Sequence, residues 1–310
     1  MRLVSYRRGR QVRAGLLSGE RVLDIEEEAA SRGKALPSSV LSILELGEGA
    51  LKTLRRIERS AHRGAGRSLR SVKLCAPVPN PRKLFCLAGN YLEHIAEGAR
   101  KGKAGVKLVC GKKYVTPRVF MKPPSTTVCG PGDPIIVPKV GQKIDWEAEL
   151  AVVIGKRGKY IRRESALDHV AGFTCINDVS ERALLIRRRS ETEEWDKFFD
   201  WLNGKWMDHF APMGPTLVLR DEIPDPSDLR IRLFVNGKAM QDARTSAMIY
   251  DVPNIIEYIS AIVTLEPGDV IATGTPSGVG FARGIFLKPG DVVEVEIEKI
   301  GTLRNPVLGE

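Results

Sequence analysis

Two carboxylates open the most apolar stretch of this sequence. Glu147 and Glu149 lead directly into residues 150–154, Leu-Ala-Val-Val-Ile, which predict a buried strand ending at Gly155. Alternate residues of a strand project from the same face, so both carboxylates point the same way. Their like charges repel each other unless a cation lies between them, which favours a hard divalent metal: Mg²⁺, Mn²⁺ or Ca²⁺. The alternative is a solvent-exposed strand end.

A third carboxylate stands at the end of a second predicted strand. Asp178 follows an apolar run at residues 170–176. Three carboxylates provide a charge and a set of oxygen ligands that suit Mg²⁺, with water or substrate completing the octahedron. Asp178 is therefore a candidate third ligand. Its alternative role is the N-cap of a helix that begins at Val179.

A histidine and a glutamate have the spacing of a general base and its partner. His94 and Glu97 lie in residues 91–97, which have helical character. At this spacing a carboxylate orients an imidazole, and the other ring nitrogen is left to accept a proton. Such a base typically accelerates a reaction by about 10²–10⁴-fold. A surface histidine beside a helical neighbour is the alternative.

Two lysines and a glycine-rich loop are further candidates. Lys122 and Lys205 stand among apolar residues, where an ammonium group needs an anion. That anion is either a substrate carboxylate or enolate, or the carboxylate of a structural salt bridge. Residues 273–280, Thr-Gly-Thr-Pro-Ser-Gly-Val-Gly, form either a cradle of backbone N–H groups for a carboxylate or simply a tight loop.

The elements around these residues predict two domains. The N-terminal part contains a short antiparallel meander, a helix capped by Ser38-Ser39 and a second amphipathic helix through Leu51, Leu54 and Ile57. We predict a small domain at residues 1–72, with a linker at its end. The larger domain at residues 73–310 begins its first strand at residue 84.

The larger domain is predicted to be mostly strands. Pro-Gly-Asp recurs three times, each time before a β-branched run, at residues 131–133, 267–269 and 289–291. Residues 98–117 predict a loop, residues 254–262 an amphipathic helix, and residues 181–205 an exposed helix or lid-like excursion. The pattern indicates an α+β, mostly β fold, and it contains neither βαβ alternation nor a G-x-G-x-x-G loop.

Composition narrows the partners and the location. The 310 residues contain no apolar run long enough to span a membrane, and the start of the chain has no signal-peptide pattern. Five scattered cysteines without a C-x-x-C pair are typical of a reducing compartment, so we expect a cytoplasmic protein. The net charge of +10 suggests nucleic acid, but aromatic residues are only 6% and do not interleave the basic cluster. We therefore expect no nucleic-acid partner.

Taken in order, these motifs resemble the fumarylacetoacetate hydrolase family. The resemblance covers residues 84–306 and is carried by Asn90-Tyr91-x-x-His94-x-x-Glu97, Phe120-x-Lys122-Pro123, Asp145-x-Glu147-x-Glu149, Asn177-Asp178-Val-Ser-x-Arg182, Gly204-Lys205-x-x-Asp208 and Asp269-Val-Ile-x-Thr273-Gly-Thr275-Pro. The family often has Gln seven residues after the metal-binding Asp, where this sequence has Leu185. The segment between Asp178 and Lys205 is also longer than in compact members.

The resemblance implies a fold, a site and an assembly. It implies a β-roll or sandwich catalytic domain behind a small N-terminal domain, and commonly a homodimer. The implied roles are Mg²⁺ or Mn²⁺ ligation by Glu147, Glu149 and Asp178, a His94–Glu97 dyad beside Lys205, and a substrate pocket with Tyr91, Lys122 and Thr275. Family members act on 2-oxo or 2,4-dioxo acids.

The first reaction we expect is hydrolytic cleavage of a C–C bond in an acylpyruvate-like 2,4-dioxo acid. In that reaction His94 and Glu97 activate a water that attacks a substrate chelated to the metal. The alternative is isomerase, tautomerase or decarboxylase activity on an oxaloacetate-like or 2-hydroxy-diene-dioate substrate at the same metal site. In a tautomerase the enolate is reprotonated and no water attacks.

Overall fold

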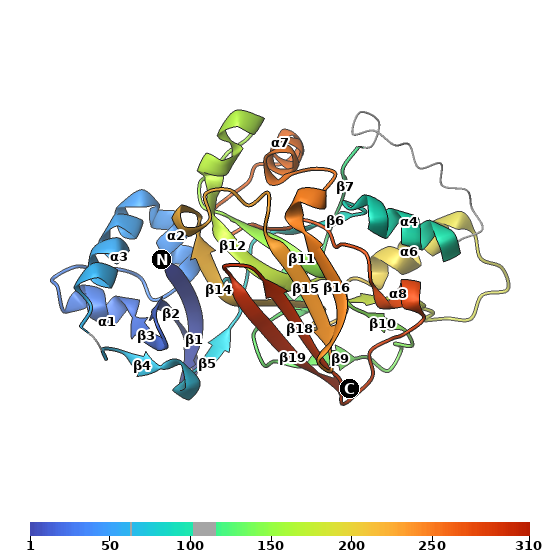
Figure 1. Ribbon diagram of the computed structural model, residues 1–310, viewed down its shortest axis with the longest axis horizontal. Coiled ribbons are helices and arrows are strands. Elements are labelled where there is room, and N and C mark those ends of the chain that lie inside the picture. Colours follow the sequence, from blue (N-terminus) through green and yellow to red (C-terminus); the bar gives the residue numbers. More distant parts are fainter. Residues whose placement is uncertain (63, 102–115) are drawn as a thin grey trace.

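The computed structural model describes residues 1–62, 64–101 and 116–310, which form sheets of twelve, five and two strands with helices around them (Figure 1). The predicted α+β, mostly β fold is confirmed. Two predicted elements agree closely with the structure. The strand expected from residue 84 is β6 (Leu84–Ala88), and the amphipathic helix expected at residues 254–262 is α7 (Val252–Ile262).

The twelve-stranded sheet runs through the whole molecule. Ten of its strands are, in order across the sheet, β4 (Arg67–Ser68), β3 (Arg21–Asp24), β2 (Gln11–Ser18), β1 (Arg2–Arg8), β14 (Ala211–Leu219), β12 (Val170–Asn177), β11 (Ala148–Ile154), β17 (Val270–Ala272), β6 and β7 (Arg118–Met121). Off this path, β5 (Lys73–Cys75) pairs with β1, and β8 (Val128–Cys129) pairs with β14. The N-terminal strands join the larger part through the antiparallel pair β1–β14. The domain boundary at residue 72 stays a prediction.

Two smaller sheets complete the β structure. The five-stranded sheet has the order β16 (Lys238–Arg244), β15 (Arg230–Val235), β18 (Val292–Ile297), β19 (Gly301–Gly309) and β9 (Ile135–Val137). The third sheet pairs β10 (Ile144–Asp145) with β13 (Ser180–Glu181). The Pro-Gly-Asp turns lead into β9, β17 and β18, as predicted from their turn chemistry.

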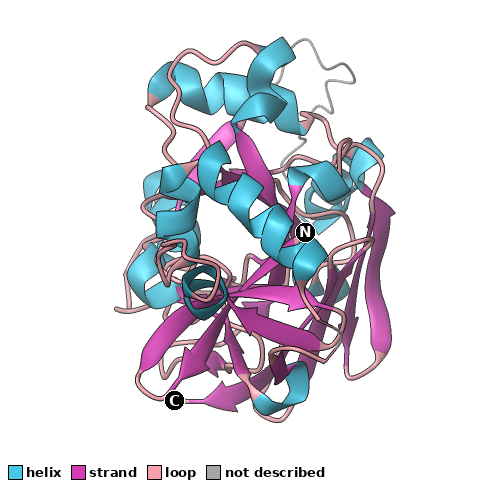
Figure 2. Cartoon of the chain, turned by 90° about the vertical axis from the view of Figure 1, so that its left-hand side faces the viewer, coloured by secondary structure: helices cyan, strands magenta, loops and turns pink. Residues whose placement is uncertain are grey.

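The helices lie around these sheets. Besides α7 they are α1 (Ile25–Ala30), α2 (Val40–Leu46), α3 (Glu48–Ser60), α4 (Leu92–Lys101), α5 (Pro124–Thr127), α6 (Glu194–Asn203) and α8 (Gly280–Arg283), with 3₁₀ turns η1 (Leu69–Ser71), η2 (Arg163–His169), η3 (Arg220–Glu222) and η4 (Thr245–Ala247). Ser39 caps α2, since its side chain accepts from the Ser42 N–H at 3.0 Å. Figure 2 views the molecule from the side of α1 to α3, with helices in front of the strands.

Strand β11 is buried on both faces, which explains its unbroken apolar sequence. Leu150 and Val152 pack into the core shared with the five-stranded sheet. Ala151 and Val153 face the opposite way, into the core that includes α2 and α3. Both glutamates therefore lie at the start of a strand that is buried along its whole length, where neighbours on each side restrict the side-chain positions.

Two segments predicted from the sequence, residues 98–117 and 181–205, can be compared with the described residues. The loop predicted at residues 98–117 falls mostly outside the described residues, and its first residues continue α4. The excursion at residues 181–205 contains α6, as the helical interpretation predicted, and Leu185 is exposed. None of the helices in the described ranges is long and apolar enough to cross a membrane. Cys75, Cys86, Cys129 and Cys175 are free and buried, and Cys110 lies outside the described residues.

Candidate metal centre and active site

The three predicted metal ligands converge at the ends of β11 and β12. The antiparallel register pairs Ala148 with Asn177, and the Asp178 N–H donates to the Glu147 carbonyl at 2.9 Å. One carboxylate oxygen from each of Glu147, Glu149 and Asp178 lies within 4.8 Å of the other two. All three residues are buried, so the solvent-exposed strand end is wrong. The helix-cap alternative for Asp178 is also wrong, because strand β13 follows it.

Glu149 carries the clearest indication that this group of carboxylates suits a cation. Its Oε2 accepts from the Gly274 N–H at 2.6 Å, whereas Oε1 is buried and has no hydrogen-bond partner in the described structure. Burial raises the pKa of this carboxyl well above its usual range, and the charges of Asp178 and Glu147 raise it further. A divalent ion at this point would coordinate the orphan oxygen and favour the charged form. The donor set therefore fits a hard divalent metal.

Lys205 lies between two of the carboxylates. Its buried ammonium donates to Glu147 Oε2 at 2.8 Å and to Asp178 Oδ2 at 2.7 Å. Burial on its own lowers the pKa of Lys205, but the charges of Asp178 and Glu147 outweigh it and raise the pKa to about 12. The lysine is thus a fixed positive charge at the metal centre, as the family resemblance implied.

Lys122 supports the same centre from another side. Its ammonium donates to Asp178 Oδ1 at 2.6 Å and to the backbone carbonyls of Val179 and Phe210 at 2.9 and 2.6 Å. These contacts use all three of its donors. In the structure Lys122 therefore orients Asp178, the predicted third ligand, which is the salt-bridge alternative considered from the sequence. Its role as a substrate contact stays a prediction.

The predicted dyad forms at the start of α4. His94 Nδ1 lies 3.0 Å from Glu97 Oε1, and the two side chains are 20% and 19% exposed. Glu97 also accepts from the Gly278 N–H, at 2.9 and 3.1 Å from its two oxygens. A carboxylate can only accept, so Nδ1 carries the hydrogen and Nε2 remains as the basic nitrogen. Burial on its own raises the pKa of the neighbouring Glu147 carboxyl, but the charges of Lys205 and Arg182 outweigh burial and lower that pKa below its usual range.

Tyr91 and Thr275, the other two predicted substrate contacts, differ in their surroundings. The Tyr91 hydroxyl is buried without a hydrogen-bond partner among the described residues, and burial and the charge of Glu149 raise its pKa. It is therefore a donor that a ligand can use. The Thr275 hydroxyl instead donates to the Ala148 carbonyl at 2.9 Å and accepts from Gln241 Nε2 at 2.9 Å. Thr275 ties its loop to β11, and its contact with substrate stays a prediction.

Three residues of the site had no role assigned from the sequence. Arg182 bridges Asp145 and Glu147 with its guanidinium, and Gln241 joins β16 to Ala148 and Thr275. Arg182 and Asp145 both stood in quoted motifs. The sequence could have identified both residues, because each is a charged residue beside an apolar run that predicts a buried strand. A buried charge requires a partner of opposite charge. Gln241 offered no such signal, because amides are common on exposed strands.

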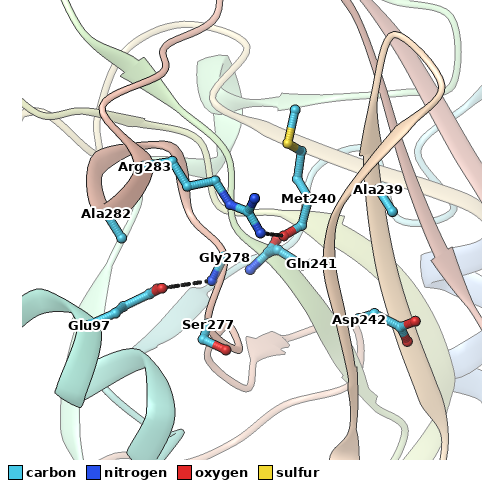
Figure 3. Close-up of a pocket in the computed structure, with 9 residues that line it drawn as sticks. All are labelled: Glu97, Ala239, Met240, Gln241, Asp242, Ser277, Gly278, Ala282 and Arg283. Atoms are coloured by element: carbon cyan, nitrogen blue, oxygen red, sulfur yellow. Dashed lines mark hydrogen bonds between the residues drawn. The ribbon is translucent and has the colours of Figure 1, made fainter.

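A cavity of about 650 Å³ is lined by Glu97 of the dyad, by part of β16 and by residues between 277 and 283 (Figure 3). Glu97, Ser277 and Gly278 form one wall, and residues 239–242 of β16 form the other. Figure 3 shows Arg283 above the cavity, where it donates to the Met240 carbonyl at 2.6 Å. The carboxylate member of the dyad, Glu97, is therefore open to this cavity.

Comparison with known proteins identifies the family. A family model described as fumarylacetoacetate (FAA) hydrolase, C-terminal, matches residues 83–308. The mitochondrial oxaloacetate tautomerase of Xenopus laevis is 40% identical over 295 residues, which cover 94% of this chain and 84% of that protein. The mitochondrial oxaloacetate tautomerase of Bos taurus is 42% identical over 275 residues, covering 88% and 81%. Both relatives are named as mitochondrial proteins, so the comparison does not support the cytoplasmic location predicted from the sequence. That location stays a prediction.

A solved structure extends the comparison to a metal. Maleylpyruvate hydrolase from Sphingobium, in complex with manganese(II) and pyruvate, matches with a TM-score of 0.75 and 30% identity over 100% of this chain and 99% of that chain. Together with the buried acidic triad, this similarity indicates a divalent-metal site. The fold, the family model and these relatives agree: the chain is an enzyme that belongs to the fumarylacetoacetate hydrolase family.

Proposed function

We propose that the chain is a divalent-metal-dependent tautomerase that interconverts the keto and enol forms of oxaloacetate. The observation that carries the proposal is the 40% identity, over 84% of its length, with a relative named oxaloacetate tautomerase. The charged centre of this chain supports it, since enolisation needs a base for a carbon-bound proton and positive charge for the enolate oxygen. Hydrolysis, the first reaction expected from the sequence, has weaker support from the comparisons.

In this proposal Glu147, Glu149 and Asp178 hold Mg²⁺ or Mn²⁺. The metal, when bound, supplies positive charge that stabilises an enolate. Lys122 and Arg182 orient two of the ligands through the contacts described above. The substrate is a small 2-oxo acid with a second carboxylate.

His94 moves the proton at carbon. Its Nε2 removes a proton from C3 of the keto acid, and the C2 oxygen of the resulting enolate takes a proton from solvent to give the enol, while Glu97 stabilises the imidazolium through Nδ1. In the reverse direction the C2 oxygen releases its proton to solvent and the imidazolium returns one to C3. Lys205 donates a hydrogen bond to the oxygen on C2, where negative charge develops. Tyr91, whose hydroxyl has no hydrogen-bond partner among the described residues, is the candidate donor to the substrate carboxylate.

Exchange at C3 tests the proposal directly. In D₂O the protein should accelerate replacement of the C3 protons of oxaloacetate, followed by NMR, and should accelerate the decay of the enol absorbance. EDTA should abolish both effects, and Mg²⁺ or Mn²⁺ should restore them. If the rates with protein equal those of buffer, or if metal-free protein remains fully active, the proposal is wrong. Simultaneous assay of pyruvate with lactate dehydrogenase detects decarboxylation as a competing outcome.

Hydrolysis of an acylpyruvate-like 2,4-dioxo acid is the second candidate. It is favoured by the similarity to a maleylpyruvate hydrolase solved with manganese(II) and pyruvate. Here the same dyad activates a water that attacks the distal carbonyl. Incorporation of ¹⁸O from labelled water into the acid product distinguishes the reactions, since only hydrolysis requires it.

The assembly and partners remain proposals as well. We propose a homodimer, as the family resemblance implies, and a small-molecule substrate without a nucleic-acid partner. Light scattering after size-exclusion chromatography gives the mass to compare with the 34.2 kDa chain. DNA binding that persists at physiological salt would contradict the absence of a nucleic-acid partner.

A further inference from the structure

Asp145 is a buried carboxylate with four hydrogen-bond donors around it. Its Oδ1 accepts from the Gly280 N–H at 2.6 Å and from the Trp146 N–H at 2.8 Å. Its Oδ2 accepts from the Phe281 N–H at 3.1 Å and from Arg182 Nε at 2.9 Å. One side chain therefore binds both the start of α8 and an arginine from the far end of β13.

The arginine continues this connection to the metal centre. While Arg182 Nε binds Asp145, its terminal NH2 nitrogen donates to Glu147 Oε1. The other oxygen of Glu147 accepts from Lys205 at 2.8 Å. The guanidinium is a rigid plane, so its two contacts hold Asp145 and Glu147 in one geometry.

The segment at residues 277–281 connects Asp145 to the dyad. Gly278, whose N–H binds Glu97, is two residues before Gly280, whose N–H binds Asp145. Both glycines are packed closely against neighbouring backbone. A Cβ on Gly278 would lie 2.2 Å from the Met240 carbonyl oxygen, and a Cβ on Gly280 would lie 2.2 Å from the Ile285 carbonyl oxygen and 2.7 Å from Asp145 Oδ1. Movement at one of the two N–H groups therefore carries the other with it.

We propose that Asp145 is a positioning residue that couples the metal centre to the general base. The connection runs from Glu147 through Arg182 to Asp145, then through Gly280 and Gly278 to Glu97, which orients His94. Neither Asp145 nor Arg182 needs to touch the substrate for this role. The effect of Asp145 on turnover rests on the tautomerase or hydrolase function proposed above. The structural connection between Glu147 and Glu97 does not depend on that function.

A merely structural role makes a different prediction. If Asp145 only stabilised the fold, its loss would lower the unfolding temperature and affect turnover independently of Glu97. If it positions Glu97, its effect on turnover disappears once Glu97 can no longer act. A double-mutant cycle with Asp145→Asn and Glu97→Gln measures this dependence.

The matched control is Asp269→Asn. Asp269 is also fully buried and also binds a backbone N–H, that of Glu266 at 2.8 Å, and a cation, Lys83 at 2.9 Å. It lies in a turn before β17, and within the described residues its hydrogen bonds and ion pair involve no residue of the proposed connection.

The first measurement is hydrogen–deuterium exchange on the full chain, without substrate. Asp145→Asn should accelerate exchange about 10-fold or more in peptides covering residues 277–283 and residues 92–98, while Asp269→Asn should leave both unchanged. Unchanged exchange in residues 92–98 of the Asp145 variant overturns the proposal. This result holds whether or not the protein has the proposed activity.

The second measurement is turnover with Mn²⁺ at saturation. Asp145→Asn should reduce kcat about 10-fold in the wild-type background, and less than about 2-fold in the Glu97→Gln background. Equal effects in both backgrounds overturn the proposal. Absence of any wild-type activity refutes the proposed function alone, and the exchange result then decides the link.

A second variant covers the case in which Asp145→Asn does not fold. Arg182→Lys keeps the positive charge beside Glu147 but lacks the fork that reaches Asp145 at the same time. It should accelerate exchange in residues 92–98 in the same way. Normal exchange in this variant, measured with a folded protein, overturns the connection through Arg182.

Discussion

Lys205 lies between Glu147 and Asp178, with its Nζ 2.8 Å from a carboxylate oxygen of the first and 2.7 Å from one of the second. The two carboxylates come from the ends of different strands, so one ammonium group holds β11 and β12 together at the metal centre. The third carboxylate, Glu149, keeps one oxygen without a partner in the described structure. The ammonium group of Lys205 occupies one side of the three carboxylates, and the unpartnered oxygen of Glu149 faces the position where we expect a metal to bind.

Replacing Glu149 with Gln should remove metal binding and leave the fold intact. Burial and two neighbouring carboxylates already favour its neutral form without metal, so a neutral isostere costs little. In wild-type protein, Mn²⁺ at about 100 times its Kd should stabilise the fold by about 2.7 kcal/mol. Thermal unfolding should show that shift in the control Glu298→Gln and none in Glu149→Gln. A full metal shift in Glu149→Gln would contradict its assignment as a ligand.

Replacing His94 with Ala should reduce kcat about 10²–10⁴-fold because the base is lost. The Kd for Mn²⁺, measured by calorimetry, should change little, since the predicted metal ligands are Glu147, Glu149 and Asp178 and do not include His94. The matched control is His169→Ala, since the Nδ1 of this histidine lies 3.0 Å from the Lys156 carbonyl, away from the carboxylate triad. Equal loss of metal affinity in the His94 and Glu149 variants would mean that the roles are wrongly assigned.

Replacing Lys122 with Met should destabilise the protein and weaken metal binding together. The change removes one of the two buried cations beside Asp178 and the hydrogen bonds that Lys122 donates to two backbone carbonyls. Breaking a buried ion pair in this way costs about 3–5 kcal/mol. Urea unfolding and Mn²⁺ titration should show both effects, and the exposed control Lys139→Met should show neither. If only KM rises, Lys122 contacts the substrate instead.

Acid should weaken the N-terminal part of the fold through Asp24. Burial alone would raise the pKa of Asp24, but hydrogen bonds from Arg13 and Tyr6 outweigh it and lower the pKa to about 2. The folded value lies below the unfolded value of 3.8, so the ionised carboxylate stabilises the fold above about pH 4. That stabilisation, about 2 kcal/mol, is lost as the pH falls toward 2.

Asp24→Asn tests this pH dependence. The difference in unfolding free energy between wild type and variant should shrink as the pH is lowered from 5 to about 2, in urea titrations at each pH. The exposed control Asp225→Asn should show no comparable change. A difference that stays constant over this range would contradict the role of the Asp24 charge.

Local patterns in the sequence predicted most of the secondary structure. Alternation and apolar runs predicted β1 to β3, β11 and β12, and Ser39 predicted the start of α2, because these signals depend on neighbours within a few residues. The spacing of His94 and Glu97 was sufficient to predict their contact for the same reason, since a helix brings residues three apart close together.

What the sequence by itself determined was therefore the elements and the chemical types of the site: three carboxylates at strand ends, a histidine–glutamate pair and two lysines in apolar surroundings. Only the tertiary structure decided which charges meet. The pairing of Lys122 with Asp178, and the connection of Glu147 through Arg182 to Asp145, join residues far apart in the chain. These contacts depend on strand register and on the packing of residues 277–281, and neither is encoded in any local pattern.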